Sequence, residues 1–352
     1  MMKALQKSSD RFLLYEKHQR WLILLPVLLV ITYSLGFRTA QWGSDTPAYI
    51  AVYQLMVKTP SYLLEYEWLF TSIVKWMTNI SQNPSYFFSF LVFFNIVMLT
   101  VNAVFLGRFI WGTKDNYRFI ILLYLISFIS PFFLSAQINV IRHGTALSFV
   151  ILFYFMVLNR SSVIWLILTA LIAQGFHSTS FLFIIPSIGL FFSYKYITRF
   201  LLFLMLLYVT GMTPYLVQKF SVFTGIPLYE KIMNYGIKAQ YVRGLRYKFV
   251  IFTMGMGLFC DFFGRFFLKT TVKTNYIAVL KIYWLLCLPF LLVGYGAFSD
   301  RFLLPCWTLL SYLLAIVLKS IDGVFRLSIL LWIFGLYVVA TGYFIFNYIS
   351  GM

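Results

Sequence analysis

The chain is poor in cysteine and lacks the common metal and nucleotide motifs. Its three cysteines, Cys260, Cys287 and Cys306, lie in or beside apolar segments with no close partner, so neither a disulfide framework nor a metal cluster is indicated. No HExxH, CxxC, P-loop or Asp-x-Asp sequence occurs, and an Asp-x-Asp cluster is what would hold Mg²⁺ for a nucleotide-sugar donor. The sequence therefore predicts no metal and no cofactor.

Charge is also scarce. Only 11% of the residues are charged, whereas 61% are hydrophobic and 21% aromatic, and apolar stretches recur along all 352 positions. This composition excludes a soluble domain and predicts an all-α, polytopic integral membrane protein. The net charge of +18 does not indicate nucleic acid, because most basic residues lie in short gaps between apolar runs, where they orient helices in a membrane.

A helix needs roughly 17 to 25 residues to cross the hydrocarbon core. The apolar runs that fit or nearly fit this length predict about eleven transmembrane helices, within a range of about ten to twelve. These runs are 20–37, 86–107, 118–135, 145–159, 162–176, 178–193, 198–216, 247–266, 275–295, 302–319 and 326–347.

The basic residues predict which way the helices run. A basic N-terminal stretch precedes run 20–37, which ends without a small-residue cleavage pattern, so we interpret it as a retained signal anchor with a cytoplasmic N-terminus. Strict alternation then places the short basic gaps inside, as the positive-inside rule requires. These gaps contain Arg108, Lys114 and Arg118; Arg160; Lys195 and Arg199; Arg265, Lys269 and Lys273; and Lys319 and Arg326.

The predicted outer face contains a first loop at 38–85, a second at 136–144, a basic loop at 217–246, and turns at 175–179 and 296–301. Within the first loop, segment 65–80 has Leu69, Ile73 and Trp76 at helical spacing, which favours an amphipathic interfacial helix over a further span. No repeat or soluble extramembrane domain is visible, so 1–352 is predicted to be a single polytopic membrane domain.

Ionisable residues that interrupt the apolar runs converge on this outer face. They are Arg38, Asp45, Arg142, His143, His177, Arg243, Arg246, Asp300 and Arg301. Ionisable residues at a membrane boundary are candidates for a functional site, so this convergence predicts one.

Each candidate also has a structural interpretation. Asp45 or Thr46 could cap a helix that has Pro47 in its first turn. The adjacent Arg142 and His143 open a helix, where they could present positive potential to an anion or snorkel at the interface.

The remaining candidates leave similar alternatives open. His177, in a tight turn, suits either a structural hydrogen bond or general-base work. Arg243 and Arg246 lie in a loop whose positive charge breaks the positive-inside rule, so that loop either binds an anion such as phosphate or reflects an inverted topology. Arg301 either pairs with Asp300 or reaches an outer cleft.

Two further carboxylates, Glu65 and Glu67, would lie about 200° apart on a helix. We therefore interpret them as poorly placed either to bind one metal ion or to act together as an acid and a base.

The succession of these motifs resembles the EpsG and Wzy-type polysaccharide polymerases of O-antigen or capsule synthesis. The resemblance is carried by Arg38, Gly43-Ser44-Asp45-Thr46, Tyr49, Glu65 or Glu67 before an apolar and aromatic helix, Ile141-Arg142-His143 with Ala146, and Phe176-His177-Ser178. Stretch 243–249 is similar to a Gly-x-Arg-x-Asp-Phe pattern, but Lys248 stands where Asp is usual. That departure leaves Arg246 as the residue carried over.

The resemblance implies a membrane glycosyltransferase on the outer face of the bacterial cytoplasmic membrane. Such polymerases join polyprenyl-pyrophosphate-linked oligosaccharide units, and a flippase and a chain-length regulator would be their protein partners. Arginines and a helix N-terminus could stabilise the pyrophosphate leaving group without a metal. Membrane lipid is the surrounding partner, and no nucleic acid is expected.

The expected roles follow from this chemistry. The candidates for holding the pyrophosphate or substrate are Arg38, Arg142, His143, Arg243, Arg246 and Arg301. His177 or Asp45 would accept the proton of the acceptor hydroxyl. The aromatic residues Trp42, Tyr49, Tyr241 and Tyr247 would stack on sugars or anchor the protein at the interface.

Two other functions fit parts of the pattern. A ligase that moves finished glycan from the same carrier would need nearly the same arginines and base. A flippase or transporter is a different class, and it usually has ionisable residues near the midplane, whereas most polar residues here lie at span ends. Lys281 and Asp261 are the exceptions.

Overall fold

The structure is a computed structural model that describes residues 24–62, 65–112, 116–234, 243–320 and residue 335. The described residues form helices and no strand, so the all-α prediction is confirmed. After a first helix at Leu24–Gly36, the elements are α2 (Thr46–Lys58), α3 (Trp68–Ile80), α4 (Pro84–Trp111), α5 (Tyr117–Ile129), α6 (Pro131–Ile138), α7 (Ile141–Leu158), α8 (Val163–Phe176), α9 (Ser180–Ile184), η1 (Ile185–Phe191), α10 (Tyr194–Val209), α11 (Met212–Thr224), α12 (Leu228–Asn234), α13 (Tyr247–Phe267), α14 (Thr270–Leu286), α15 (Leu288–Val293), η3 (Ser299–Phe302) and α16 (Leu304–Ser320).

Ten of the eleven predicted runs fall on described helices, and run 326–347 lies outside the described residues except for residue 335. By length and composition, four helices could cross a membrane, or six if each of two bent pairs counts as one span. The other predicted runs correspond to shorter apolar helices at Leu24–Gly36, Val163–Phe176, Ser180–Phe191 and Leu304–Ser320. The chain is thus a multi-pass membrane protein, in which four to six described spans have full length.

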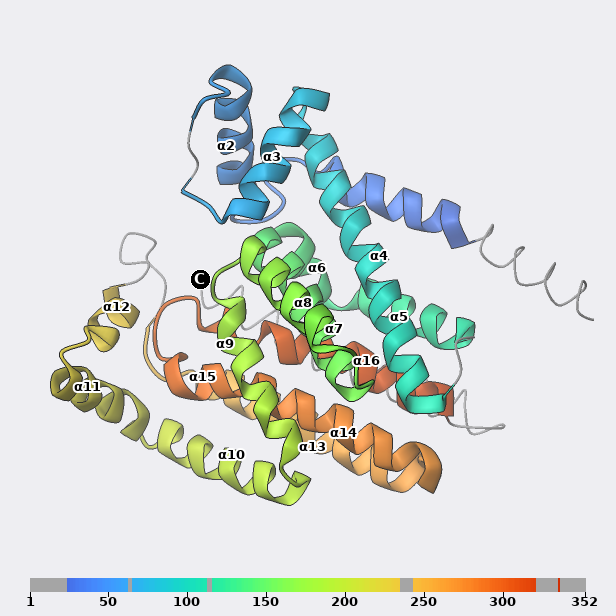
Figure 1. The fold of residues 1–352 in the computed structure, drawn as a ribbon, viewed down its shortest axis with the longest axis vertical. Helices are drawn as coiled ribbons and strands as arrows, with labels where there is room; N and C mark the ends of the chain where they lie inside the picture. The colour runs from blue at the N-terminus through green and yellow to red at the C-terminus, as the bar shows by residue number, and fades with distance from the viewer. Residues whose placement is uncertain (1–23, 63–64, 113–115, 235–242, 321–334, 336–352) are drawn as a thin grey trace, which may run out of the picture.

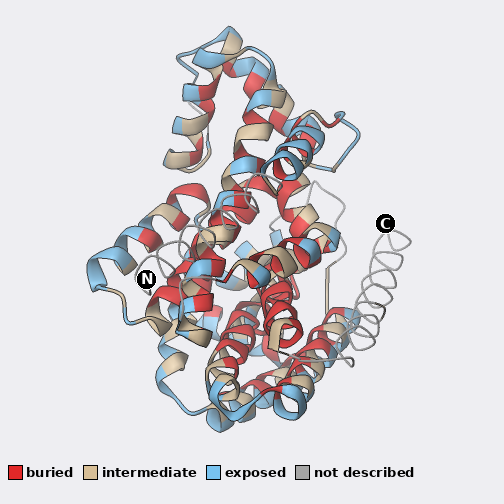
Figure 2. Ribbon diagram, turned by 90° about the vertical axis from the view of Figure 1, so that its right-hand side faces the viewer, coloured by how far each residue is buried: buried red, intermediate tan, exposed pale blue. Residues whose placement is uncertain are grey.

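The bundle is apolar on its outside as well as in its centre. Figure 2 shows buried positions gathered inside the bundle and exposed positions along its periphery. Many exposed residues are large and apolar, including Phe191 (84% exposed), Val222 (74%) and Ile251 (72%). Such a surface is costly in water but suits contact with lipid chains.

Run 118–135 was predicted to be a single helix, but the structure shows a bent pair of helices. Helices α5 and α6 meet at an angle of 72°, with Ser130 in an extended conformation (φ −75°, ψ 120°) and Pro131 in the first turn of α6. Proline lacks an amide hydrogen and disfavours helical geometry in the residue before it. The bend turns α6 away from the axis of α5.

Run 198–216 is also bent. Helices α10 and α11 meet at 87°, and Gly211 between them has φ +76°, a left-handed conformation that glycine adopts without a steric penalty. The predicted basic loop 217–246 is therefore partly helical, because it contains the end of α11 and all of α12. Residues 235–242 of this loop, which include Tyr241, lie outside the described residues.

The first predicted outer loop contains two helices, which Figure 1 shows at the top of the molecule. Helix α2 begins at Thr46, as the Asp45-Thr46-Pro47 sequence predicts. In α3 the buried residues are Phe70, Val74 and Met77. Of the predicted apolar stripe, Leu69 and Ile73 are half-buried and Trp76 is 52% exposed. The helix packs against α2, α4 and α8, so these neighbours decide which of its apolar residues are covered.

The predicted second outer loop, 136–144, is also not a loop exposed to water. It is divided between α6 and α7, and the amide of Asn95 on α4 donates to Gln137 Oε1 at 2.9 Å and to Thr145 Oγ1 at 3.2 Å. All three side chains are buried. Polar groups inside a membrane protein need internal partners, and these contacts hold α6 and α7 together and position the start of α7.

Two hydrogen bonds join gaps that the charge pattern assigns to the cytoplasmic side. At the end assigned to the cytoplasm, Lys319 Nζ donates to Asn116 Oδ1 at 2.7 Å, and the Asn275 amide donates to the Phe109 carbonyl at 2.8 Å. The starts of α2, α3 and α7 and the end of α8 belong to the predicted outer face.

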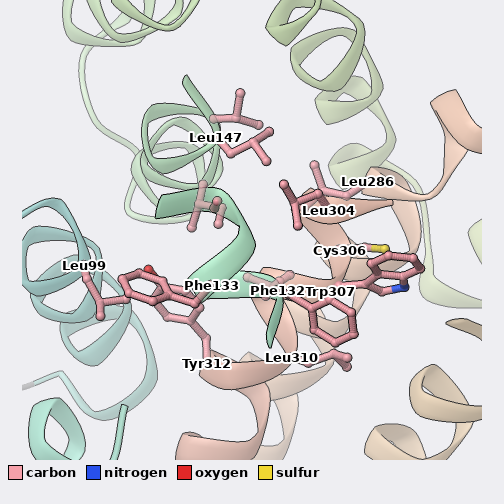
Figure 3. Close-up of a cluster of buried hydrophobic side chains, with 14 of the residues drawn as sticks. Leu99, Phe132, Phe133, Leu147, Leu286, Leu304, Cys306, Trp307, Leu310 and Tyr312 are labelled. Carbon is pink, nitrogen blue, oxygen red and sulfur yellow. The ribbon is translucent and has the colours of Figure 1, made fainter. Parts of the chain in front are cut away.

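An aromatic and aliphatic cluster anchors the bent helix α6 to α16 (Figure 3). The ring centroids of Phe132 and Trp307 lie 4.8 Å apart, and Trp307 Nε1 donates to Thr253 Oγ1 on α13 at 2.9 Å. Trp307 is 2% exposed. A buried indole with a hydrogen-bonded N–H packs strongly. Its contact with Phe132 fixes the position of α6 and so the point where α7 begins.

Replacing Gly144 with alanine is expected to destabilise the protein by about 1–3 kcal/mol, the usual cost of overpacking. A Cβ at this position of α7 would lie 2.3 Å from the Ala136 carbonyl oxygen, whereas one at Gly255 on α13 would meet nothing within 4 Å. Thermal unfolding in detergent should therefore show a lowered midpoint for Gly144→Ala and an almost unchanged midpoint for the control Gly255→Ala. Equal midpoints would contradict this view of the α6 and α7 contact.

Candidate functional site

Glu67 joins three segments that are distant in sequence. Its Oε2 accepts from Arg142 at 2.6 Å, and its Oε1 is 2.8 Å from His177 Nδ1. Oε1 also accepts from the amide of Ser178 at 3.0 Å and from its hydroxyl at 3.3 Å. Glu67 precedes α3, Arg142 lies in the first turn of α7, and His177 follows α8, so one carboxylate connects these three helix ends.

Local structure frees this carboxylate for the site. Glu67 is the N-cap residue of α3, with an extended backbone (φ −61°, ψ 146°), and its side chain makes no capping hydrogen bond. The close packing of α8 on α3 brings the partner segment near, because a Cβ at Gly175 would lie 2.9 Å from Leu69 Cβ and from the Trp68 ring. A larger residue at Gly175 would separate the two helix ends that carry Glu67 and His177.

The protonation of Glu67 follows from its surroundings. Burial alone would raise the pKa of its carboxyl, but the hydrogen bonds from His177 and from the Ser178 amide, with the charge of Arg142, hold that pKa well below its usual range. Hydrogen bonds to the charged form of an acid have this effect. Glu67 is therefore an anion at neutral pH, and it acts as a hydrogen-bond acceptor and counter-ion.

Arg142 is held against aromatic rings as well as against Glu67. Its guanidinium carbon lies 4.1 Å from the centroid of the Tyr66 ring and 5.8 Å from that of Phe70, and the group also interacts with the Tyr49 side chain. Arginine stacks well on such rings. Its Nε is buried and finds no hydrogen-bond partner among the described residues, so the protein does not saturate the guanidinium.

The two histidines of the site take opposite tautomers. His143 Nε2 is 2.9 Å from the Arg301 carbonyl oxygen, which can only accept, so Nε2 carries the hydrogen and Nδ1 can accept from Thr179 Oγ1 at 3.5 Å. His177 Nδ1 faces the Glu67 carboxylate and therefore carries its hydrogen. In the described part of the chain, His177 Nε2 has no hydrogen-bond partner, which leaves it as the nitrogen that can accept a proton.

A second ion pair adjoins the first. Arg301 donates from one terminal nitrogen to Asp45 Oδ2 at 3.0 Å, across 256 residues, and the Ser44 hydroxyl donates to Asp45 Oδ1 at 3.3 Å. The Asp45 side chain makes no cap hydrogen bond to α2. The Arg301 side chain thus contacts a segment that is distant in sequence.

His143 connects the two pairs. Its Nε2–H donates to the Arg301 carbonyl oxygen, and its ring centroid lies 5.0 Å from that of His177, with the ring planes perpendicular. Phe298, before η3, has φ +56° and ψ 34°, a left-handed conformation that is rare for a bulky residue, and its ring lies 4.2 Å from the Arg301 guanidinium. Both ring nitrogens of His143 are occupied by the protein, although the sequence predicted a substrate contact there.

Arg38 is 7% exposed and its donors go to the protein. They reach Thr46 Oγ1 at 3.2 Å, the Leu35 carbonyl at 2.8 Å and the Ile138 carbonyl at 3.4 Å, while its guanidinium lies 4.2 Å from the Phe88 ring centroid. Burial lowers the pKa of Arg38 to about 10. The observed contacts fasten the first loop to the end of α6.

Arg243 and Arg246 form a neighbouring group. Between them Gly244, at φ +104°, donates to the Tyr295 carbonyl at 2.8 Å, and Tyr295 belongs to the segment between α15 and η3 that leads to Arg301. Among the described residues, Arg243 Nε is buried without a hydrogen-bond partner. The basic loop therefore abuts the segment that carries Arg301.

The remaining polar candidates lie outside this site. Lys281 Nζ donates to the carbonyls of Leu190 and Phe192 at 2.8 and 2.6 Å, and Asp261 pairs with Arg265 at 2.9 Å one turn away on the same helix. Within the described residues, no group of three or more His, Cys, Asp or Glu side chains could hold a metal ion. The positive charge of the site comes from its arginines.

The fold and this arrangement define a multi-pass, all-α membrane protein whose ionisable residues gather at helix ends. Residues 21–351 match the sequence model of the EpsG family, and the chain belongs to that family. No curated protein and no solved structure matches it. The family is of the polysaccharide-polymerase type, which confirms the resemblance in the sequence and supports a glycosyltransferase-like role in polysaccharide synthesis.

Proposed function

We propose that this protein polymerises polyprenyl-pyrophosphate-linked oligosaccharide repeat units on the outer face of the bacterial cytoplasmic membrane. The observation that carries the proposal is the pairing of Arg142 with Glu67 and of Arg301 with Asp45, with the two pairs linked through His143 and His177. Both arginines are partly exposed, each with 21% of its side chain accessible. The site thus offers two cations and one available imidazole nitrogen at the helix ends.

The chemistry of the proposed reaction matches these groups. The acceptor hydroxyl oxygen forms a bond to the anomeric carbon of the growing glycan while the bond from that carbon to the pyrophosphate oxygen breaks. The pyrophosphate leaves with the bonding electrons and gains negative charge, which arginines stabilise. The hydroxyl proton passes to His177 Nε2. The site therefore needs fixed cations near the carrier lipid and one base near the acceptor.

Between the two predicted bases, the contacts favour His177. Asp45 is engaged by Arg301 and by Ser44, so both of its carboxylate oxygens already accept hydrogen bonds from the protein. Arg142 and Arg301 are the proposed pyrophosphate ligands, while Arg243 and Arg246 are assigned to the same substrate from the neighbouring loop. Arg38 is assigned to hold the first loop in place.

Deletion of the gene separates the proposed function from its alternatives. If the protein is the polymerase, the mutant should carry single repeat units on their final acceptor and no long chains on its surface. Accumulated polymer on the carrier lipid would instead identify a ligase, and absence of both from the outer face would identify a flippase. Long chains retained after deletion would exclude the polymerase.

A further inference from the structure

Glu67 is the acceptor for every polar group that reaches it from the two neighbouring helix ends. It binds Arg142 through Oε2 and binds His177 and both donors of Ser178 through Oε1. Its side chain is 15% exposed and His177 is 14% exposed. A partly buried carboxylate with this many donors is held in place, because moving it would break several hydrogen bonds at once.

We propose that Glu67 is the positioning residue of the site: it holds His177 in the Nδ1–H tautomer, so that Nε2 is the base, and it sets the place of Arg142. This inference rests on the proposed function and assigns to it a residue that does not itself touch the substrate. A carboxylate that orients an imidazole through one nitrogen leaves the other nitrogen basic and in a defined direction. The same carboxylate here also fixes the arginine.

The alternative role for Glu67, as the base itself, fits the contacts poorly. Both carboxylate oxygens are occupied by donors from the protein, and the residue is an anion stabilised in that form. A proton taken by Glu67 would have to displace one of those donors. His177 Nε2 faces no such competition in the described part of the chain.

The Glu67 carboxylate does not cap α3, although its position would allow it to do so. An N-cap side chain commonly accepts a hydrogen bond from the first turn of its helix, but Glu67 makes none to α3. Glu65, two residues earlier, is exposed and takes part in no hydrogen bond or ion pair within the described residues. Glu65→Gln is therefore a matched control for a loss of carboxylate charge near the start of α3.

The test compares Glu67→Met, which has similar length but no acceptor, with Glu67→Gln, which keeps an acceptor oxygen. Purified protein labelled with ¹⁵N-histidine reports the tautomer directly, because protonated and bare ring nitrogens give well separated signals. The chain has three histidines, and the signals of His177 are assigned by their loss in His177→Gln. Surface glycan ladders in the deletion strain, complemented with each variant, report chain growth.

In the wild type the neutral His177 ring should show a protonated Nδ1 and a bare Nε2. Glu67→Met should mix the tautomers and slow chain growth by roughly 10- to 100-fold, the usual effect of losing a partner that orients a reactive group. Glu67→Gln should retain the tautomer and recover part of the activity, and Glu65→Gln should match the wild type in both. If Glu67→Met fails to fold, the Glu67→Gln tautomer decides.

The outcomes distinguish the inference from the function on which it rests. An unchanged tautomer in Glu67→Met, or in Glu67→Gln a mixed tautomer with wild-type chain growth, would overturn the positioning role even if deletion shows a polymerase. A tautomer that changes as expected, in a protein whose deletion leaves long chains intact, would support the positioning of His177 while removing the polymerase.

Discussion

Arg142→Ala is expected to abolish chain growth, with a loss of at least about 100-fold, as for removal of one group that stabilises charge in a transition state. In the proposed reaction the pyrophosphate gains charge as the glycosidic bond breaks, and Arg142 shares its partner Glu67 with the His177 base. Glu67 would keep its contacts with His177 and Ser178, so the loss should come mainly from the missing cation. The measurement is the length distribution of surface glycan in a complemented deletion strain.

Two further variants sharpen that result. Arg142→Lys keeps the charge but loses the planar contact with the Tyr66 ring, so it should restore chain growth only in part. Arg108→Ala removes an exposed arginine near the end of α4, at the face predicted to be cytoplasmic, and should leave the ladder unchanged. Long chains of normal length from Arg142→Ala, in a strain that contains the protein in its membrane, would remove this residue from the site.

His177→Ala and His177→Gln are both expected to stop chain growth, by about 100- to 10,000-fold, the range attributed to a general base. Glutamine can still donate a hydrogen bond toward Glu67, which replaces the structural part of the histidine, but it cannot accept a proton at neutral pH. A purely structural histidine would therefore be rescued by glutamine, whereas a base would not. The readout is again the glycan ladder, with membrane insertion checked by protein detection in the membrane fraction.

Asp45→Asn decides between the two bases that the sequence left open. If His177 is the base, Asp45→Asn weakens the contact with Arg301 and should shorten the chains without stopping growth. If instead Asp45→Asn stops growth while His177→Gln supports long chains, the assignment is reversed.

The sequence anticipated Arg142 and His177 but passed over Glu67. The carboxylates of Glu65 and Glu67 were assessed as a pair on one helix, but α3 starts at Trp68, and Glu67 precedes it in an extended conformation. The partners of Glu67 lie 75 and 110 residues further along the chain, so no local pattern could show them. The available signal was the place of Glu65 or Glu67 in the order of family motifs, which did not separate the two.

For three other residues the type was predicted and the partner was not. Arg38 and His143 were expected to face a substrate, yet their polar atoms contact protein groups from α6, α2 and η3. Arg301 was expected to pair with its neighbour or to reach a cleft, and it contacts Asp45 instead. Whether a side-chain donor binds a protein acceptor or stays free for a substrate depends on which helix ends pack together. The bends at Pro131 and Gly211 set much of that packing.

The sequence by itself determined that this protein crosses a membrane and that it is helical, and it predicted that the charged residues divide between two faces. These properties depend on hydropathy and charge summed over neighbouring residues, so they can be read from a single chain. Only the tertiary structure decided which charges meet: Glu67 with Arg142 and His177, and Asp45 with Arg301. The physical reason is that a hydrogen bond needs its atoms within about 3 Å, and across such separations in sequence only the packing of bent helices brings them that close.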